Sequence, residues 1–175
     1  PGVTELEIAW QAEKYMREHG ADSLAFPIII ASGPNSAIPH HTTSNRKITT
    51  NDIVLVDLGC KIDGYCSDIT RTFFVGQATS EMLKIEAIVK SAHSAALKSI
   101  NPRRYTLAAK TVDHAARQVI SRSGFADYFP HGTGHGLGLD IHEAPSISLN
   151  PKPLPRNEVL RGYTLYPNTV VTIEP

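Results

Sequence analysis

The feature that most constrains the fold is a pair of strand-forming segments, residues 52–59 (DIVLVDLG) and 65–76 (YCSDITRTFFVG), joined by the short run CKIDG. Short runs of β-branched and aromatic residues, bounded by turn-forming residues, predict an antiparallel hairpin. Each strand carries one aspartate, Asp57 in the first and Asp68 in the second. The register of the hairpin therefore decides how close these two carboxylates lie.

Two registers are open. If residues 61–64 form the turn, Asp57 and Asp68 are directly opposite each other, with Cβ atoms about 5 Å apart. If Asp63 and Gly64 alone form a tight turn, Asp57 faces Thr70 and Asp68 is its diagonal neighbour. Side chains alternate between the two faces of a strand, so both registers place the carboxylates on the same face. The pair is predicted to converge.

The surroundings of Asp57 indicate what the pair is for. Val54, Val56 and Leu58 predict that the first strand is buried, and a buried pair of like charges requires a cation. Arg71 falls on the opposite face, so a divalent metal is the predicted partner, as in hydrolytic sites where oxygen ligands bridge two ions roughly 3.5–4 Å apart. The alternative is an exposed hairpin face on which water screens the two charges.

A second unusual run is HGTGHGLGLDIHEAP, residues 131–145. It is not a phosphate loop, because no lysine follows the glycines, and it is not a helical zinc motif, because glycines disfavour a helix and one of them stands where that motif requires glutamate. It predicts an extended segment with His135, His142 and Glu143 near its ends. Histidines in a chain with a converging carboxylate pair favour a metal site, and Glu174, in VVTIEP, adds a carboxylate on an apolar strand.

The remaining elements are ordinary. Thr4 and Glu7 form a predicted capping box for a helix that runs to Glu18, FPIII predicts a strand, and residues 80–100 and 106–123 predict amphipathic helices that end at Asn101-Pro102 and at Gly124. With 175 residues and 41% hydrophobic residues, the chain can form one globular domain.

Charge and composition exclude several partners. The formal net charge is zero, and no apolar run approaches the roughly 20 residues that span a bilayer, so neither nucleic acid nor a membrane is expected as a partner. Cys60 and Cys66 are the two cysteines. We expect them to be reduced thiols in a cytoplasmic protein.

The segments VLVDLGCKIDGYCSDITRTFFVG, HGTGHGLGLDIHEAP and VVTIEP resemble the pita-bread metallopeptidases: proline dipeptidase, aminopeptidase P and methionine aminopeptidase. PGVTELEIA and ASGPNSAIPHH are also similar to that family, so the resemblance covers essentially all 175 residues. SDITRTF with GLDIHEAP is more similar to the Xaa-Pro peptidases. The resemblance implies an α+β fold, in which helices cover an antiparallel sheet, and a catalytic domain spanning residues 1–175.

The resemblance also implies roles for individual residues. Asp57 matches a ligand of one metal ion, Asp68 a carboxylate that bridges two ions, His135 the histidine ligand, and Glu174 a glutamate ligand with a proton-transfer role. Three further positions match histidines on the substrate side of the site, namely His40, His131 and His142. Two divalent ions (Mn²⁺, Co²⁺ or Zn²⁺) are the implied cofactors, and a short peptide with proline at its second position is the implied substrate.

The chain departs from the family pattern in two ways. The run between Pro145 and Val170 is longer than the family's usual connection, and a fifth ligand, a second glutamate on a later strand, has no counterpart before Pro175. We therefore expect a partial catalytic domain that lacks the closing strands and the family's N-terminal domain. Methionine aminopeptidase activity and a non-catalytic module that binds peptides or proteins are the alternative functions, and a homodimer is a possible assembly.

Overall fold

The computed structural model describes residues 1–100, 106–149 and 163–175. It shows which of the two possible hairpin registers the chain adopts. Strand β3 (Ile53–Leu58) pairs antiparallel with β6 (Ile69–Phe74), and β4 (Cys60–Ile62) pairs with β5 (Tyr65–Cys66). Asp57 lies opposite Thr70, and Val56 lies opposite Arg71. The tight-turn register is therefore the correct alternative, and the prediction that Arg71 falls on the face opposite to Asp57 is confirmed.

The local cause of this register is the turn itself. Asp63 has φ of 51° and Gly64 has φ of 83°, so both central residues adopt the left-handed conformation. Two-residue turns of this kind match the twist of the flanking strands, and they favour an Asp-Gly sequence. The turn also separates the two cysteines, because Cys66 lies opposite Lys61 whereas Cys60 accepts a hydrogen bond from Ser67 N (2.8 Å). Both thiols are free, as expected.

The described chain divides into two compact units. The first contains residues 1–79 and 139–141, and the second contains residues 80–138 and 142–175. In the first unit, β3 is the middle strand of a sheet in the order β2-β3-β6, in which β2 spans Ile29–Ser32. A second small sheet in this unit has the order β1-β4-β5, in which β1 spans Ser23–Leu24.

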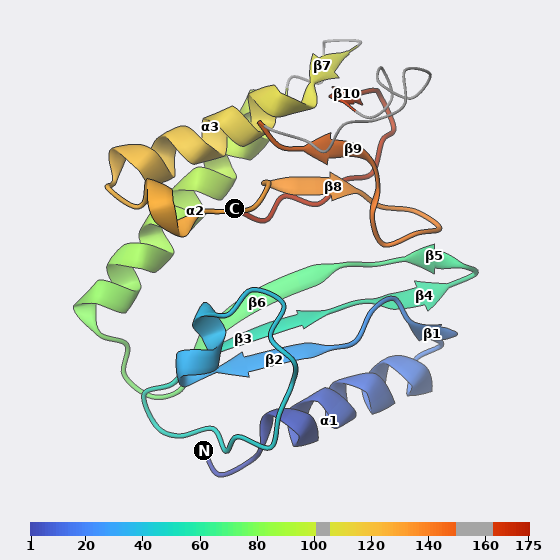
Figure 1. Ribbon diagram of the computed structural model, residues 1–175. Helices are drawn as coiled ribbons and strands as arrows, with labels where there is room; N and C mark the ends of the chain where they lie inside the picture. Colours follow the sequence, from blue (N-terminus) through green and yellow to red (C-terminus); the bar gives the residue numbers. More distant parts are fainter. Residues whose placement is uncertain (101–105, 150–162) are drawn as a thin grey trace. The chain divides into compact units, whose positions relative to one another are not determined.

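Helix α1 (Glu5–Glu18) packs on one face of the first sheet (Figure 1). Its predicted capping box is present, because Thr4 Oγ1 accepts from Glu7 N (3.1 Å) and Glu7 Oε2 accepts from Thr4 N (2.6 Å). The apolar face of the helix covers a core of buried aliphatic residues from the sheet and the neighbouring loop: Ile28, Ile30, Ile48 and Val54. After β2 the chain forms the short 3-10 helix η1 (Gly33–Ala37).

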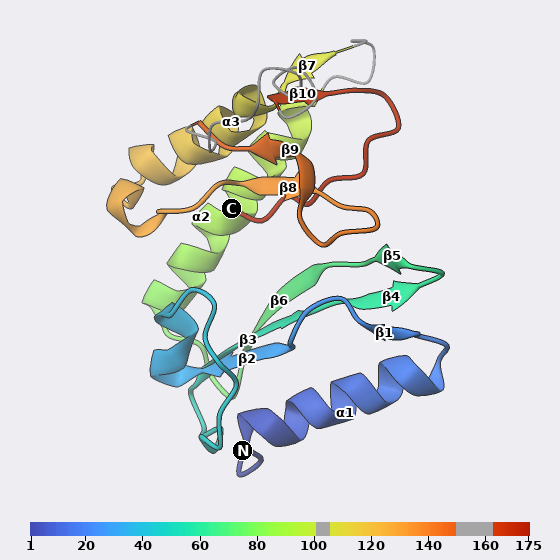
Figure 2. The same cartoon turned by 45° about the vertical axis from the view of Figure 1, so that its right-hand side comes forward.

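The second unit is built on two helices, α2 (Ser80–Ser99) and α3 (Ala109–Arg122), which pack against each other. The second helix begins three residues later than predicted, because Leu107–Ala108 form strand β7, paired with β10 (Thr164–Leu165). Strands β8 (Gly134–Gly136) and β9 (Glu143–Ile147) form a hairpin alongside these helices (Figure 2), after the 3-10 helix η2 (Ala126–Tyr128). The glycine and histidine run is extended in β8 and at the start of β9, but it bends over residues 138–142, so it forms a hairpin and not the single extended segment that was predicted.

Buried side chains of α3 and β9, including Val112, Ala116 and Ile147, form the core of this unit. The predicted helix end at Asn101-Pro102 and most of the long run between Pro145 and Val170 lie outside the described residues. In the parts of the chain that the structure describes, no helix is both long and apolar enough to cross a bilayer.

Candidate metal centre

The first unit holds the two predicted aspartate ligands. Asp57 is on the central strand β3, and its Oδ1 atom is buried. Asp68 lies directly before β6, one residue from Ile69, whose partner is Leu58. The register makes Asp68 the diagonal neighbour of Asp57, so the backbone places both carboxylates on one face of the hairpin.

His40 belongs to the same unit, and it is exposed on a turn with φ of 54°. The neighbouring His41 has a structural position instead, since its Nε2 lies 3.0 Å from Oε2 of the fully buried Glu5. The two adjacent histidines therefore differ sharply in environment. Glu5 was not singled out in the sequence, where an acidic residue in the first turn of a helix is normally solvated.

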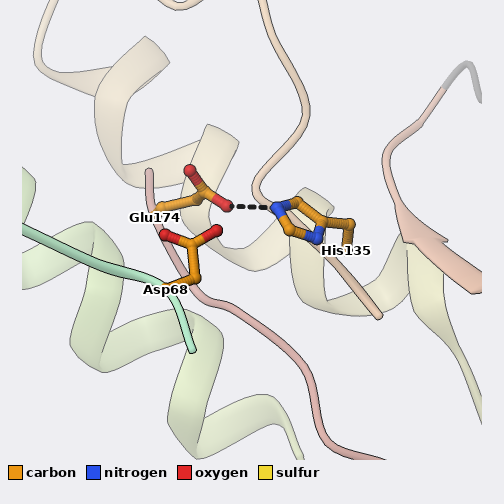
Figure 3. Close-up of side chains that lie close together, drawn as sticks. All are labelled: Asp68, His135 and Glu174. Carbon is orange, nitrogen blue, oxygen red and sulfur yellow. Dashed lines mark ion pairs between the residues drawn. The ribbon is translucent and has the colours of Figure 1, made fainter. Parts of the chain in front are cut away.

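The second unit brings His135 and Glu174 together. His135 Nε2 lies 3.2 Å from Glu174 Oε1, and the side chains are 16% and 38% exposed. Figure 3 marks this pair with a dashed line. The other ring nitrogen of His135, Nδ1, lies 2.9 Å from the Gly136 carbonyl oxygen. A carbonyl can only accept, so Nδ1 carries a proton and Nε2 is the atom that faces Glu174.

Burial raises the pKa of Glu174, but hydrogen bonds from His135 and Thr172 outweigh it, so the pKa lies below the ordinary value of a glutamate. The carboxylate is therefore ionised at neutral pH. An ionised carboxylate oxygen beside an imidazole nitrogen, each partly shielded from water, is a donor set that fits a divalent transition ion.

The other two predicted histidines also lie in this unit. The ring of His142 stacks edge-on against that of His135, with centroids 4.4 Å apart. His131 is exposed, with its ring edge-on to Phe129 (4.9 Å), and it contributes to lowering the pKa of Glu174. The rings of His131 and His142 therefore place further hydrogen-bonding nitrogens in the segment, residues 131–145, that holds His135.

Two supporting groups were missed in the sequence. Thr172 donates from Oγ1 to Glu174 Oε1 (2.6 Å). Asp113, fully buried on α3, accepts from Thr133 N (3.0 Å) and pairs with Arg117 Nε (3.1 Å). A signal for Thr172 was present, because residues 172 and 174 of an extended segment share a face; Asp113 had none, since its partners are remote in sequence.

Comparison with known proteins agrees with this chemistry. Metallopeptidase family M24 matches residues 1–175. The uncharacterized peptidase YqhT of Bacillus subtilis is 39% identical over 175 residues, which are 100% of this chain and 46% of that protein. The structure of the prolidase from Pyrococcus furiosus has a TM-score of 0.87 at 39% identity, over 98% of this chain and 47% of that one.

The X-Pro aminopeptidase from Thermotoga maritima superposes with a TM-score of 0.81 at 39% identity, over 89% of this chain and 44% of that one. The fold is thus that of the pita-bread metallopeptidases. The chain belongs to metallopeptidase family M24, which implies divalent metal ions as cofactors. It spans about half the length of these relatives.

Proposed function

We propose that the protein hydrolyses the peptide bond that precedes proline in short peptides, with two divalent metal ions as cofactors. The observation that carries this proposal is the His135–Glu174 pair, in which an imidazole nitrogen and an ionised carboxylate oxygen, 3.2 Å apart, face each other. The similarity of the chain to solved structures named as a prolidase and an X-Pro aminopeptidase supports the choice of substrate.

In this proposal the metal ligands are Asp57 and Asp68 of the first unit and His135 and Glu174 of the second. Mn²⁺, Co²⁺ and Zn²⁺ all suit carboxylate oxygens with one imidazole. When bound, the ions supply Lewis acidity and a nucleophilic water at neutral pH. The roles of the chain's own residues are binding, orientation and proton transfer.

The remaining roles follow from side-chain chemistry. His142 or His131 donates a hydrogen bond to the oxygen on which negative charge develops, an interaction with an effect of about 100-fold or more on rate. The ionised Glu174 carboxylate accepts the proton that the attacking water gives up and passes it to the nitrogen of the departing proline. His40, exposed on its turn, contacts the substrate. A proline nitrogen in a peptide bond carries no hydrogen, so a pocket that fits the ring is the source of specificity.

The test has a metal arm and a substrate arm. After dialysis against chelator and then Mn²⁺, elemental analysis should find manganese in the parent protein and in the control variant Lys84→Ala. Lys84 is on α2, and its Nζ lies over the ring of Phe125. Elemental analysis should find none in Asp68→Ala. Equal manganese in Asp68→Ala and the parent would refute the ligand assignment.

In the substrate arm, the manganese-loaded protein is given Ala-Pro and Met-Ala peptides. Release of proline from the first, with little cleavage of the second, is the expected result. Preferential cleavage of Met-Ala would instead establish methionine aminopeptidase activity on the same metal centre. Metal binding without cleavage of either peptide would identify a binding module.

A further inference from the structure

The hydroxyl of Thr172 lies between the two candidate ligands of the second unit. Thr172 Oγ1 accepts a hydrogen bond from the backbone N–H of His135 (3.0 Å) and donates one to Glu174 Oε1 (2.6 Å). A hydroxyl has a single proton to donate, and here that proton is committed to the carboxylate. One side chain therefore joins the main chain of one candidate ligand to the functional group of the other.

The strand geometry does not need this hydroxyl. Residues 171–174 run alongside β8 through backbone hydrogen bonds from Thr172 N to His135 O (2.9 Å) and from Glu174 N to Thr133 O (2.7 Å). Both bonds would survive the loss of Oγ1. The backbone alone therefore holds residues 171–174 beside β8. The Thr172 side-chain oxygen acts instead on the two candidate ligands, His135 and Glu174.

Gly134 makes this close approach possible. A Cβ atom at that position would lie 2.1 Å from the Thr172 carbonyl oxygen, which is far inside van der Waals contact. Any side chain there would push residues 171–174 away from β8 and lengthen both hydrogen bonds of Thr172. The glycine thus sets the distance over which the threonine acts.

A free glutamate side chain populates many rotamers, and ordering it costs conformational entropy. In this structure Thr172 holds Oε1 of Glu174, while the Gly136 carbonyl holds Nδ1 of His135. Both candidate ligands are thereby oriented before an ion binds. Preorganisation of this kind increases metal affinity, because less side-chain freedom is lost on binding.

We propose that Thr172 is a positioning residue of the metal centre, whose hydroxyl holds the Glu174 carboxylate and the His135 backbone in ligating geometry. The inference rests on the proposed function, in that it requires His135 and Glu174 to bind metal. It assigns a task to a residue that does not itself touch the ion.

Two substitutions isolate the hydroxyl. Thr172→Val keeps the β-branched shape and removes the oxygen, whereas Thr172→Ser keeps the oxygen and removes the methyl group. Thr169→Val removes a hydroxyl from the same segment, at a residue whose backbone N–H donates to the Tyr166 carbonyl (3.2 Å), and serves as the matched control. Manganese affinity is measured for all four proteins by titration calorimetry, without reference to activity.

Thr172→Val is expected to weaken manganese binding about 10- to 100-fold, and Thr172→Ser and Thr169→Val to bind as the parent does. In the metal-free proteins, hydrogen exchange followed by NMR is a second readout. The His135 amide should exchange faster in Thr172→Val, because its acceptor is gone, while the Glu174 amide, bonded to Thr133 O, keeps its protection.

The outcomes separate the two proposals. If the parent binds manganese and Thr172→Val binds it equally tightly, the positioning role is overturned and the proposed function stands. If Thr172→Ser loses as much affinity as Thr172→Val, the methyl group matters and the hydroxyl role is again overturned. A parent that binds no manganese overturns the metal centre itself, and the positioning role with it.

Discussion

Replacing Glu5 by Gln should destabilise the first unit, because every partner of this carboxylate is a hydrogen-bond donor. Oε1 accepts from Ser32 N (2.8 Å), Ser32 Oγ (2.7 Å) and Asn35 Nδ2 (3.0 Å). Oε2 accepts from His41 Nε2 (3.0 Å), Ser44 N (3.0 Å) and Ser44 Oγ (2.7 Å). The side chain is fully buried, so water cannot replace a lost partner.

The magnitude follows from what an amide can and cannot do. Hydroxyls can rotate, and a histidine or an asparagine can present an acceptor, but the backbone N–H groups of Ser32 and Ser44 can only donate. Whichever oxygen becomes the NH₂ group of glutamine, one of these two N–H groups faces another donor and stays buried. A buried N–H group without an acceptor costs about 1–3 kcal/mol. The remaining hydrogen bonds to residue 5 also become weaker, because the acceptor is no longer charged. We expect a loss of about 2–4 kcal/mol in the free energy of unfolding.

Urea unfolding at pH 7, followed by far-UV circular dichroism and by the fluorescence of Trp10 on the same helix, measures this loss. The control is Glu18→Gln, because Glu18 is 59% exposed and its oxygen lies 3.8 Å from Lys14 Nζ; such surface pairs contribute roughly 0–1 kcal/mol. A loss below 1 kcal/mol in Glu5→Gln, or a loss equal to that of Glu18→Gln, would refute the reasoning.

The loss of stability in Glu5→Gln should also depend on pH. Burial raises the pKa of Glu5, but the hydrogen bonds from Ser44, Asn35, His41 and Ser32 outweigh it and hold the pKa far below the ordinary value of 4.5. A group with a depressed pKa stabilises the folded state fully above its unfolded pKa, and this contribution decreases as the pH falls below that value. The difference between the parent and Glu5→Gln should therefore be constant from pH 5 to 7 and should shrink below pH 4.5.

Three further changes test other parts of the structure. Gly134→Ala should weaken manganese binding by at least about tenfold in calorimetry, since its Cβ would lie 2.1 Å from the Thr172 carbonyl oxygen and separate the strands that carry the ligands. The hydrogen bond from Arg46 lowers the pKa of Asp52 to about 2, so Asp52→Asn should cost about 1 kcal/mol in urea unfolding at pH 7, and the difference should vanish as the pH falls from about 4 towards 2. Arg117→Lys should lower the melting temperature by several degrees, because a lysine cannot make the bidentate and carbonyl contacts of the guanidinium.

Much of the fold was predictable because its determinants are local. The capping box of α1 requires only Thr4 and Glu7, three residues apart. The sequence left two hairpin registers open, and the turn that Asp63 and Gly64 form in the structure decides between them. The convergence of Asp57 and Asp68 followed from strand alternation in either register. The later start of α3 was not predictable, because β7 exists only through its pairing with β10, far along the chain.

The candidate ligands could be named from the sequence because metal chemistry restricts residue types strongly. The residues that orient them could not, because orientation depends on distances between segments. Glu5 and Asp113 look like ordinary acidic residues of helices, yet both are fully buried, and their partners lie 20 to 39 residues away in several cases. Burial of a carboxylate becomes favourable only when enough donors surround it, and the sequence does not display that condition.

In the second unit, a buried carboxylate supports a candidate metal ligand that is remote from it in sequence. Asp113 on α3 holds Thr133 through its backbone N–H and its hydroxyl, and Arg117 holds the carbonyl of His131 (2.7 Å). Thr133 O in turn accepts the backbone N–H of Glu174. These hydrogen bonds connect a helix in the hydrophobic core to a candidate ligand that lies about 60 residues further along the sequence. A carboxylate that must meet an ion within tenths of an ångström tolerates little positional freedom. The position of Glu174 is therefore set by the helix as much as by the segment in which it lies.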